Sequence, residues 1–234
     1  MVGAAKVLTK ALRDEGIDVA GAPTSGRAPG GGTTIASISS MPLPAVLQEM
    51  LTTSDNNTAE MMLKEIGHQA AGKGSREAGL EIVKRQLARW GVPTTGLELY
   101  DGSGLSDDDR LTCATVLALL THLSVDDPVG QGLAVAAKPG GTLADAFVGT
   151  TLAGRLRAKT GTLYNYGDGV SGKPGAKSLS GFVPIDGGGA IEFSLLLNGA
   201  TIAEKTVYRP IWDAFGGVLA SYPHGATVAE LSPR

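Results

Sequence analysis

The chain has 234 residues, of which 42% are hydrophobic and 18% are charged, and its formal net charge is −3. This length allows one large domain or two small ones with a substantial core, and a weak negative charge without a basic stripe argues against a nucleic-acid partner. The single cysteine, Cys113, excludes an internal disulfide, and no apolar run reaches the roughly 18 residues of a membrane-spanning helix.

One helix and two short strands are predicted at the start of the chain. Apolar residues with helical spacing predict a helix over residues 4–15 that ends at Gly16. Strands are predicted over 17–21 and 34–39, on either side of a loop rich in Gly, Pro and Ser. The first residues lack the apolar region of a signal peptide, so we expect this start to be internal to a longer protein.

Helices dominate the middle of the chain. Ser75 and Thr112 are suitable N-caps, and Asp127-Pro128 places a proline in the first turn of a further short helix. The other predicted elements follow from apolar spacing and from turn residues. The predicted helices cover 42–50, 57–71, 75–90 and 112–124, and Asp101-Gly102-Ser103-Gly104 is predicted to be a turn.

The last third of the chain changes from helix to strand. Strands are predicted over 156–162, 179–185 and 190–198, the last two joined by a glycine-rich turn, and a helix over 203–219 closes the chain. Helices in the middle and strands late in the chain, covered by a final helix, indicate an α+β fold with an antiparallel sheet flanked by helices.

Two short motifs carry the chemical interpretation, Ser54-Asp55-Asn56 and Lys159-Thr160-Gly161. Taken alone, the first is explained by a helix N-cap and the second by a surface strand that ends at a glycine. Occurring together in this order, at a helix start and on a late strand, they are two of the three elements of a penicillin-recognising serine acyl-enzyme site. The third element, Ser-x-x-Lys, carries the nucleophile, and no serine of this sequence has a lysine three positions later.

Segments around both motifs resemble the class C low-molecular-weight penicillin-binding proteins, which are serine-type D-Ala-D-Ala carboxypeptidases and endopeptidases. The resemblance extends from about residue 4 to residue 222. The segments that carry it are 51–60, 100–106 with 110–112, 141–143, 158–163, 179–183 and 195–199.

The resemblance implies a β-lactamase/transpeptidase-like fold whose N-terminal part, with the nucleophile helix, is missing here. Residues 1–234 would then form one partial domain. A mainly helical subdomain is expected over about 40–150, and residues 1–39 and 151–222 are expected to supply the sheet and its covering helices. Missing strands would leave a sheet edge exposed, so we expect association with a complementary segment or self-association.

The catalytic residues expected from this comparison are Ser54, Asn56 and Lys159. The Ser54 hydroxyl can relay a proton to the departing D-alanine nitrogen, and the Asn56 amide can hold the substrate backbone. The Lys159 ammonium suits the terminal carboxylate of a stem peptide, or can polarise Ser54.

Further residues are expected to bind substrate. The Thr160 and Thr162 hydroxyls can donate to the terminal carboxylate, and Gly161 allows a ligand to approach the strand closely as an added strand. The resemblance places half of the oxyanion hole at the Thr162 backbone N–H. Asp101 and Ser103 either line the cleft or form a structural turn, because Asp-Gly is strong turn chemistry.

Two departures from the family pattern stand out. Asp107-Asp108-Asp109 follow the 101–106 segment, where the family usually has a basic residue. Residues 164–177 form an expanded stretch with Tyr164, Tyr166, Lys173 and Lys177 among glycines. This stretch is either a flap beside the cleft or a plain loop tip.

The expected function is that of a serine-type D-Ala-D-Ala carboxypeptidase of the cell envelope, periplasmic or extracellular, acting on peptidoglycan stem peptides and binding β-lactams. Without Ser-x-x-Lys the chain alone is expected to be inactive, and a complementary chain would carry the nucleophile. The alternatives are a non-catalytic stem-peptide binder, a β-lactamase-like hydrolase and a structural fragment. No cofactor or metal is expected, since the three histidines have no ligand spacing.

Overall fold

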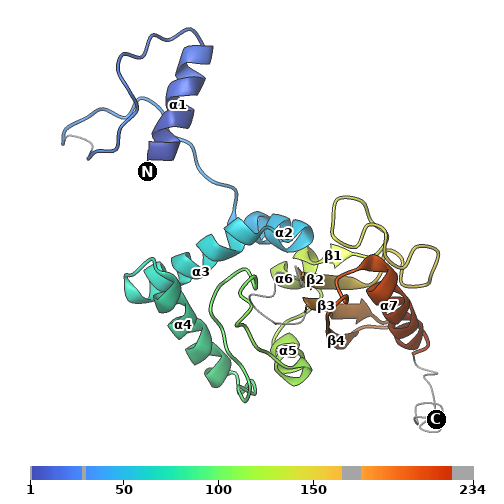
Figure 1. Ribbon diagram of the computed structural model, residues 1–234. Helices are drawn as coiled ribbons and strands as arrows, with labels where there is room; N and C mark the ends of the chain where they lie inside the picture. The colour runs from blue at the N-terminus through green and yellow to red at the C-terminus, as the bar shows by residue number, and fades with distance from the viewer. Residues whose placement is uncertain (1, 28–29, 165–174, 223–234) are drawn as a thin grey trace. The chain divides into compact units, whose positions relative to one another are not determined.

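An antiparallel sheet lies at the centre of the larger of two compact units in the computed structural model, which describes residues 2–27, 30–164 and 175–222 (Figure 1). The units are residues 1–40 and 41–234, and each is described by itself. The sheet has four strands in the order β1-β2-β3-β4. The strands are β1 (Ala134–Val135), β2 (Arg157–Leu163), β3 (Gly175–Pro184) and β4 (Ala190–Gly199).

The smaller unit contains α1 (Val2–Asp14), which has no buried residue. Gly16 follows the helix with φ 78°, a left-handed conformation that a glycine adopts without strain. The strands predicted over 17–21 and 34–39 are wrong, because the described part of this unit has no strand. A strand is stable only beside a hydrogen-bonding neighbour, and the isoleucines of the second segment, Ile35 and Ile38, are each 99% exposed. The wider grouping of residues 1–39 with the sheet stays a prediction.

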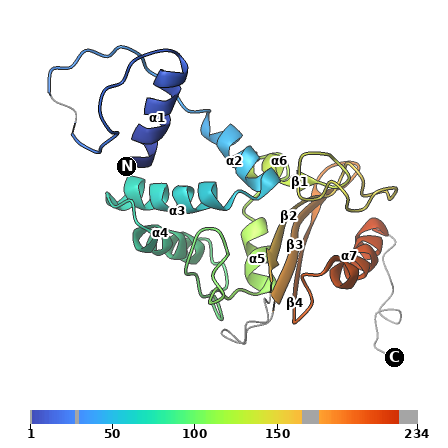
Figure 2. The same ribbon diagram turned by 45° about the horizontal axis from the view of Figure 1, so that its top comes forward.

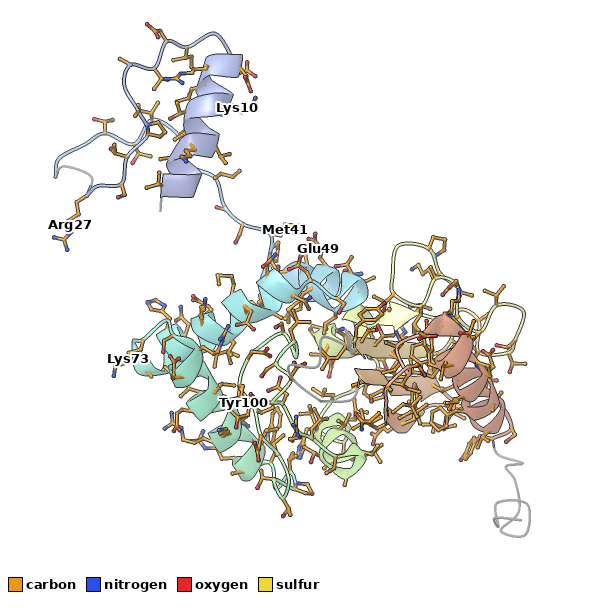
Figure 3. The ribbon with its side chains drawn as sticks, viewed as in Figure 1. Lys10, Arg27, Met41, Glu49, Lys73 and Tyr100 are labelled. Carbon is orange, nitrogen blue, oxygen red and sulfur yellow. The ribbon has the colours of Figure 1, made fainter. Side chains whose placement is uncertain are left out.

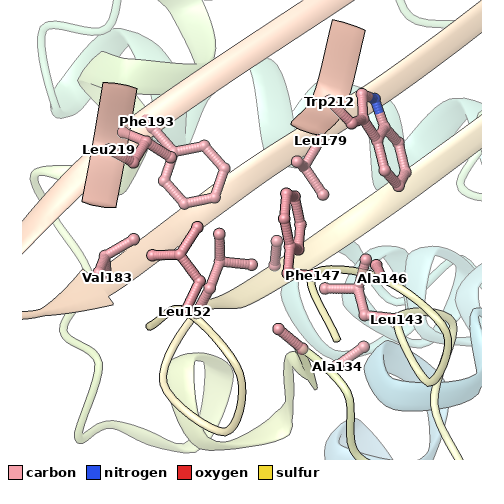
Figure 4. Packing of buried hydrophobic residues seen from close by; sticks show 13 residues of the cluster. Ala134, Leu143, Ala146, Phe147, Leu152, Leu179, Val183, Phe193, Trp212 and Leu219 are labelled. Atoms are coloured by element: carbon pink, nitrogen blue, oxygen red, sulfur yellow. The ribbon is translucent and has the colours of Figure 1, made fainter. Parts of the chain in front are cut away.

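Helices cover both faces of the sheet. In Figure 2 the sheet is seen nearly edge-on, with α5 (Cys113–Leu120) on one side and α7 (Lys205–Ala220) on the other. The main core fills the space between the sheet and α7, where Trp212 and Leu152 are each 2% exposed and Leu179 is fully buried (Figure 4). A smaller cluster of Leu120, Leu133 and Phe182 packs on the opposite face.

The helical part of the larger unit contains α2 (Leu43–Thr53), α3 (Asn56–Ala71), α4 (Arg76–Arg89) and α6 (Pro128–Gly132) besides α5. The predicted N-caps are confirmed, since the side chains of Ser75 and Thr112 accept backbone N–H groups at the starts of α4 and α5. Lys73 lies in the turn that joins α3 to α4 (Figure 3).

The predicted α+β fold with an antiparallel sheet is confirmed, with shifts at some element ends. Helix α5 ends at Leu120 rather than near 124, because the Asp127 carboxylate accepts the Ser124 N–H and draws the chain into a turn. Strand β3 begins at Gly175 rather than 179, so the end of the predicted 164–177 insert is strand. Residues 165–174 of that insert lie outside the described residues.

Strands β2 and β3 approach closely where Gly181 faces Ala158 in the register. A Cβ atom at Gly181 would lie 2.1 Å from the Arg157 carbonyl oxygen. Only a glycine fits there without pushing the two strands apart. This close contact fixes β2, which carries Lys159, against the middle of the sheet.

Candidate active site

Lys159 and Ser54, which are 105 residues apart in the chain, are in direct contact. The Lys159 ammonium donates to Ser54 Oγ over 2.6 Å and to the carbonyl oxygen of Thr160 over 2.7 Å. The contact joins strand β2 to the junction between α2 and α3. Two motifs whose separate explanations were structural therefore meet at one place.

The end of α2 is tied to the segment that precedes β2. Thr52 Oγ1 donates to the Gly132 carbonyl oxygen over 2.7 Å, and the Thr52 carbonyl oxygen accepts the Thr142 N–H over 3.2 Å. At Gly132, the last residue of α6, a Cβ atom would lie 3.0 Å from the Gln48 Cα, so α2 and α6 pack closely at this point. These contacts hold Ser54 beside Lys159.

Ser54 itself adopts a rare backbone conformation. It caps α2 with φ 61° and ψ 50°, in the left-handed region that costs a non-glycine residue about 1–2 kcal/mol. The next residue, Asp55, is the N-cap of α3 and accepts the Thr58 N–H over 2.6 Å. The chain therefore ends one helix and starts the next within two residues, and this sharp turn presents the Ser54 hydroxyl to the sheet.

Asn56 lies in the same turn but takes no part in the Lys159–Ser54 hydrogen bond. It is the first residue of α3 and is exposed. Among the described residues no hydrogen bond joins its side chain to Lys159 or Ser54, whereas Lys159 and Ser54 bond directly. The structure places Asn56 next to the pair, and its substrate-holding role stays a prediction.

The electrostatics of Lys159 are unusual for a lysine. Burial is the main cause that lowers its pKa to about 8, and the positive charge of Lys177 lowers it further. The pKa of Lys177 is itself lowered, mainly by burial and next by Arg209, while Asp145 acts in the opposite direction. An ammonium whose pKa lies near neutrality can both bind a carboxylate and exchange a proton.

Beside Lys159, strand β2 has an unpaired edge. In the described part of the chain, β1 pairs only with Arg157 and Ala158, so residues 159–163 have no neighbour on that side. The Leu156 carbonyl oxygen accepts the Ala136 N–H on the β1 side over 2.9 Å. Since backbone groups alternate along a strand, Thr160 and Thr162 direct their N–H and C=O groups to this open edge.

Asp101 and Ser103 are engaged in a turn. The Asp101 carboxylate accepts the N–H groups of Gly104 over 2.6 Å and Ser106 over 2.7 Å. Ser103 Oγ donates to Glu60 on α3 over 2.9 Å. These contacts favour the structural alternative for both residues. No hydrogen bond between this turn and Lys159 or Ser54 occurs within the described ranges, so a role in the cleft wall stays a prediction.

The acidic run at 107–109 contributes to the same turn. Asp109 Oδ1 accepts the Tyr100 N–H over 2.7 Å. Burial raises the pKa of Asp109 to about 6, and the neighbouring Asp101 carboxylate adds to the increase. At least this aspartate is part of the fold rather than a free acidic edge.

The sequence did not reveal the structural roles of two charged residues, Lys177 and Glu60. Lys177 is only 8% exposed and lies on the α7 face of β3. Its spacing of two from Leu179 is the signal that places it on that face, once the strand is known to start at Gly175. Glu60 has no such signal, because its partners are Gly102, Ser103 and Arg76, far away in the sequence.

The part of the chain that the structure describes contains no group of three His, Cys, Asp or Glu residues able to hold a metal ion. Within the same residues, every helix is too short or too polar to cross a membrane.

A sequence model of the D-Ala-D-Ala carboxypeptidase 3 (S13) family matches residues 2–221. The chain belongs to this family. It is 36% identical over 207 residues to a D-alanyl-D-alanine carboxypeptidase of Actinomadura sp. (strain R39), a match that covers 84% of this chain and 36% of the relative. It is 35% identical over 231 residues to the carboxypeptidase DacB of Mycolicibacterium smegmatis, covering 95% of this chain and 46% of the relative. The chain thus spans less than half the length of these two relatives.

Solved structures support the S13 fold. Penicillin binding protein 4 (dacB) from Haemophilus influenzae matches with a TM-score of 0.73 at 23% identity, over 94% of this chain and 49% of that one. Its complex with a β-lactam matches with a TM-score of 0.71 at 23% identity, over 92% and 50% of the two chains. At this identity the likeness shows the fold, which is the β-lactamase/transpeptidase-like fold expected from the sequence.

Proposed function

We propose that this chain forms the proton-relay and carboxylate-binding wall of a serine-type D-Ala-D-Ala carboxypeptidase of the cell envelope. The substrate is the D-Ala-D-Ala end of a peptidoglycan stem peptide, and β-lactams bind at the same place. The single observation that carries the proposal is the 2.6 Å contact between Lys159 Nζ and Ser54 Oγ. Membership of the S13 family supports the class of reaction.

The contact suits a proton relay. An ammonium has donors only, so Ser54 Oγ accepts from Lys159 and keeps its own O–H free to point elsewhere. In acyl transfer that O–H donates its proton to the leaving D-alanine nitrogen and recovers one from the lysine. A lysine whose pKa is about 8 gives up that proton far more readily near neutral pH than an ordinary lysine does.

The open edge of β2 suits the substrate. A peptide that pairs with Thr160 and Thr162 as an added strand would bring its C-terminal carboxylate to this edge, where the two threonine hydroxyls lie toward one face of the sheet and the Lys159 ammonium toward the other. Gly161 lies between these two residues and has no side chain. A Cβ atom there would lie 2.5 Å from Ser178 Oγ on β3, so the neighbouring strand also restricts this position to a small residue. The proposed binding residues therefore share one strand.

The attacking serine is proposed to come from a complementary segment. The sheet order ends at β4, whose outer edge has no strand beside it among the described residues. An open edge of ten residues is a template for another strand. We expect light scattering to show self-association of the purified chain, or a complex when a segment that supplies Ser-x-x-Lys is added. A monomer both alone and with that segment would contradict this part of the proposal.

Absence of Ser-x-x-Lys from the sequence favours a second function, reversible stem-peptide binding without turnover. One experiment tests both functions. The purified chain is titrated with an acetylated peptide ending in D-Ala-D-Ala by calorimetry, and is incubated with a fluorescent penicillin before denaturing electrophoresis. We expect micromolar-to-millimolar binding and no covalent band.

Two results of this experiment would overturn these proposals. If the chain does not bind the peptide, it has no carboxylate subsite and both functions fail. A covalent penicillin band would show that the chain contains its own nucleophile, which contradicts the need for a complementary segment.

A further inference from the structure

We infer that Lys177 is a positioning residue of the carboxylate subsite. Its ammonium lies on the α7 side of the sheet and orients the hydroxyl of Thr162 on β2. The subsite therefore selects ligands with a free C-terminal carboxylate. The inference rests on the proposed function for the identity of the ligand, but the coupling of Lys177 to the site can be measured without any ligand.

Lys177 lies on β3, next to strand β2, which contains Lys159, Thr160 and Gly161. It faces Thr162 in the register of β2 and β3, and its ammonium donates to Thr162 Oγ1 over 2.6 Å. Facing residues of an antiparallel pair point to the same side of the sheet. Lys159, whose position differs from that of Thr162 by an odd number, points to the opposite side. The two ammonium groups, one on β2 and one on β3, therefore lie on opposite faces of the sheet.

Aromatic side chains on α7 hold the Lys177 ammonium in place. It lies 4.3 Å from the centre of the Tyr208 ring and 5.1 Å from that of Trp212. Cation–π contacts are strongest for an ammonium that is shielded from water. Because Trp212 is 2% exposed and Lys177 is 8% exposed, the charge is held inside the fold and has little freedom to turn away.

The direction of the hydrogen bond sets the polarity of Thr162. The hydroxyl oxygen accepts from Lys177, so the hydroxyl proton must point to another acceptor. Thr162 also directs its backbone N–H to the open edge of β2, as shown above. The residue can thus offer two donors to an anionic group that approaches that edge.

The surrounding charges favour an anion. The described charged groups that interact with Lys177 are Lys159, Arg209 and Asp145. Asp145 is already paired with Lys205 and with Arg209, the latter over 2.9 Å. Positive charge therefore exceeds negative charge around β2. A ligand carboxylate bound there would reduce the repulsion between Lys159 and Lys177.

The test uses Lys177→Met, which keeps the length and loses the charge, with Lys205→Met as the matched control on α7. Each chain is titrated by calorimetry with an acetylated D-Ala-D-Ala peptide and with the same peptide as its C-terminal amide. We expect Lys177→Met to lower the affinity for the free acid about tenfold and to leave the amide unchanged. Lys177→Arg should restore the preference, and Lys205→Met should behave like the parent chain.

A ligand-free measurement separates this inference from the proposed function. The Lys159 titration is followed by NMR of the lysine side chains, and Lys177→Met should move the pKa of Lys159 upward because a neighbouring positive charge is lost. If the parent chain binds neither peptide, the proposed function fails while an upward shift still supports the coupling. An unshifted Lys159 titration, or an equal loss of acid and amide binding, overturns the role of Lys177.

A second variant guards against poor folding of Lys177→Met. Thr162→Val removes the hydroxyl without a change of shape and leaves the Lys177 charge in place. It should lose part of the preference for the free acid. Retention of the full preference in Thr162→Val would contradict the proposed path through Thr162.

Discussion

Replacing Lys159 with methionine is expected to weaken binding of a D-Ala-D-Ala peptide about 100-fold at pH 7, which corresponds to about 2.7 kcal/mol. The Lys159 ammonium is the charge that reaches Ser54 at the junction of α2 and α3. Hydrogen bonds to charged groups contribute about 1.5–3 kcal/mol each, and methionine cannot make them. Calorimetric titration measures the loss, with Lys205→Met as a control of equal charge change.

The pH dependence of binding identifies the same group. A carboxylate prefers the protonated lysine, so affinity should fall as the pH rises through about 8, the pKa of Lys159. In Lys159→Met this part of the profile should be flat. Unchanged affinity in the variant, or a profile that is insensitive between pH 7 and about 9 in the parent chain, would show that Lys159 does not hold the carboxylate.

The stability of the fold should change with pH in the opposite direction from peptide affinity. Burial lowers the pKa of Lys159 from 10.5 to about 8, so the unfolded chain binds more protons between these pH values. The free energy of unfolding from this site therefore rises with pH over that interval, and the contribution is lost as the pH falls through about 8. Removing the buried charge in Lys159→Met should leave the chain at least as stable at pH 7. A substitution that weakens peptide binding without weakening the fold would indicate that Lys159 serves binding rather than stability.

Replacing Glu60 with alanine is expected to lower the free energy of unfolding by about 3 kcal/mol, because it removes several charge-assisted hydrogen bonds at once. Glu60 Oε1 accepts the N–H groups of Gly102 and Ser103 and the Ser103 hydroxyl, over 2.9–3.1 Å. Its other oxygen pairs with Arg76 over 3.0 Å. These contacts fasten the turn at 101–106 and the start of α4 to α3.

Urea denaturation and thermal melting measure this loss, and the melting temperature should fall by roughly 6–12 °C. Glu65→Ala is the matched control on the same helix, since Glu65 is exposed and bonds to Gln69 one turn away. It should change stability by less than about 0.5 kcal/mol. Equal effects of the two variants would mean that the turn is held by other contacts.

Acid should remove the same stabilisation in the parent chain. Burial of Glu60 raises its pKa, but the hydrogen bonds from Gly102, Ser103 and Arg76 outweigh burial and hold the pKa at about 2. A carboxyl with a depressed pKa stabilises the fold fully above its ordinary value of 4.5, and this contribution is lost as the pH falls through about 2. Glu60→Ala should therefore show a weaker acid dependence over that range.

Features that depend on neighbouring residues were predicted well. The N-caps at Ser75 and Thr112 and the short helix that Pro128 begins were predicted correctly, because a cap or a first-turn proline acts within two or three residues. The alternation of buried residues in β3 and the apolar spacing of α7 likewise follow from the geometry of one element. The ordered segments around the two motifs were enough to indicate a low-molecular-weight penicillin-binding protein.

Predictions failed where a distant partner decides the outcome. The segments 17–21 and 34–39 have the composition of strands but no strand beside them in the described residues. For Asp101 and Ser103 the sequence left a turn and a cleft wall as alternatives, and the contacts of this segment with Glu60, 42 and 43 residues away, favour the turn. Lys177 looked like part of a loop, because only its pairing with Thr162 shows that it is inside the sheet.

The sequence by itself determined the α+β class, most of the helices and strands, and the S13 motifs, because capping, periodicity and short motifs are properties of a few consecutive residues. Only the tertiary structure shows that Lys159 donates to Ser54 and that a second lysine, Lys177, donates to Thr162 on β2. Both facts depend on strand register and on the packing of α2 and α7 against the sheet. Such contacts join residues that are far apart in the chain, and no local pattern specifies the distance between them.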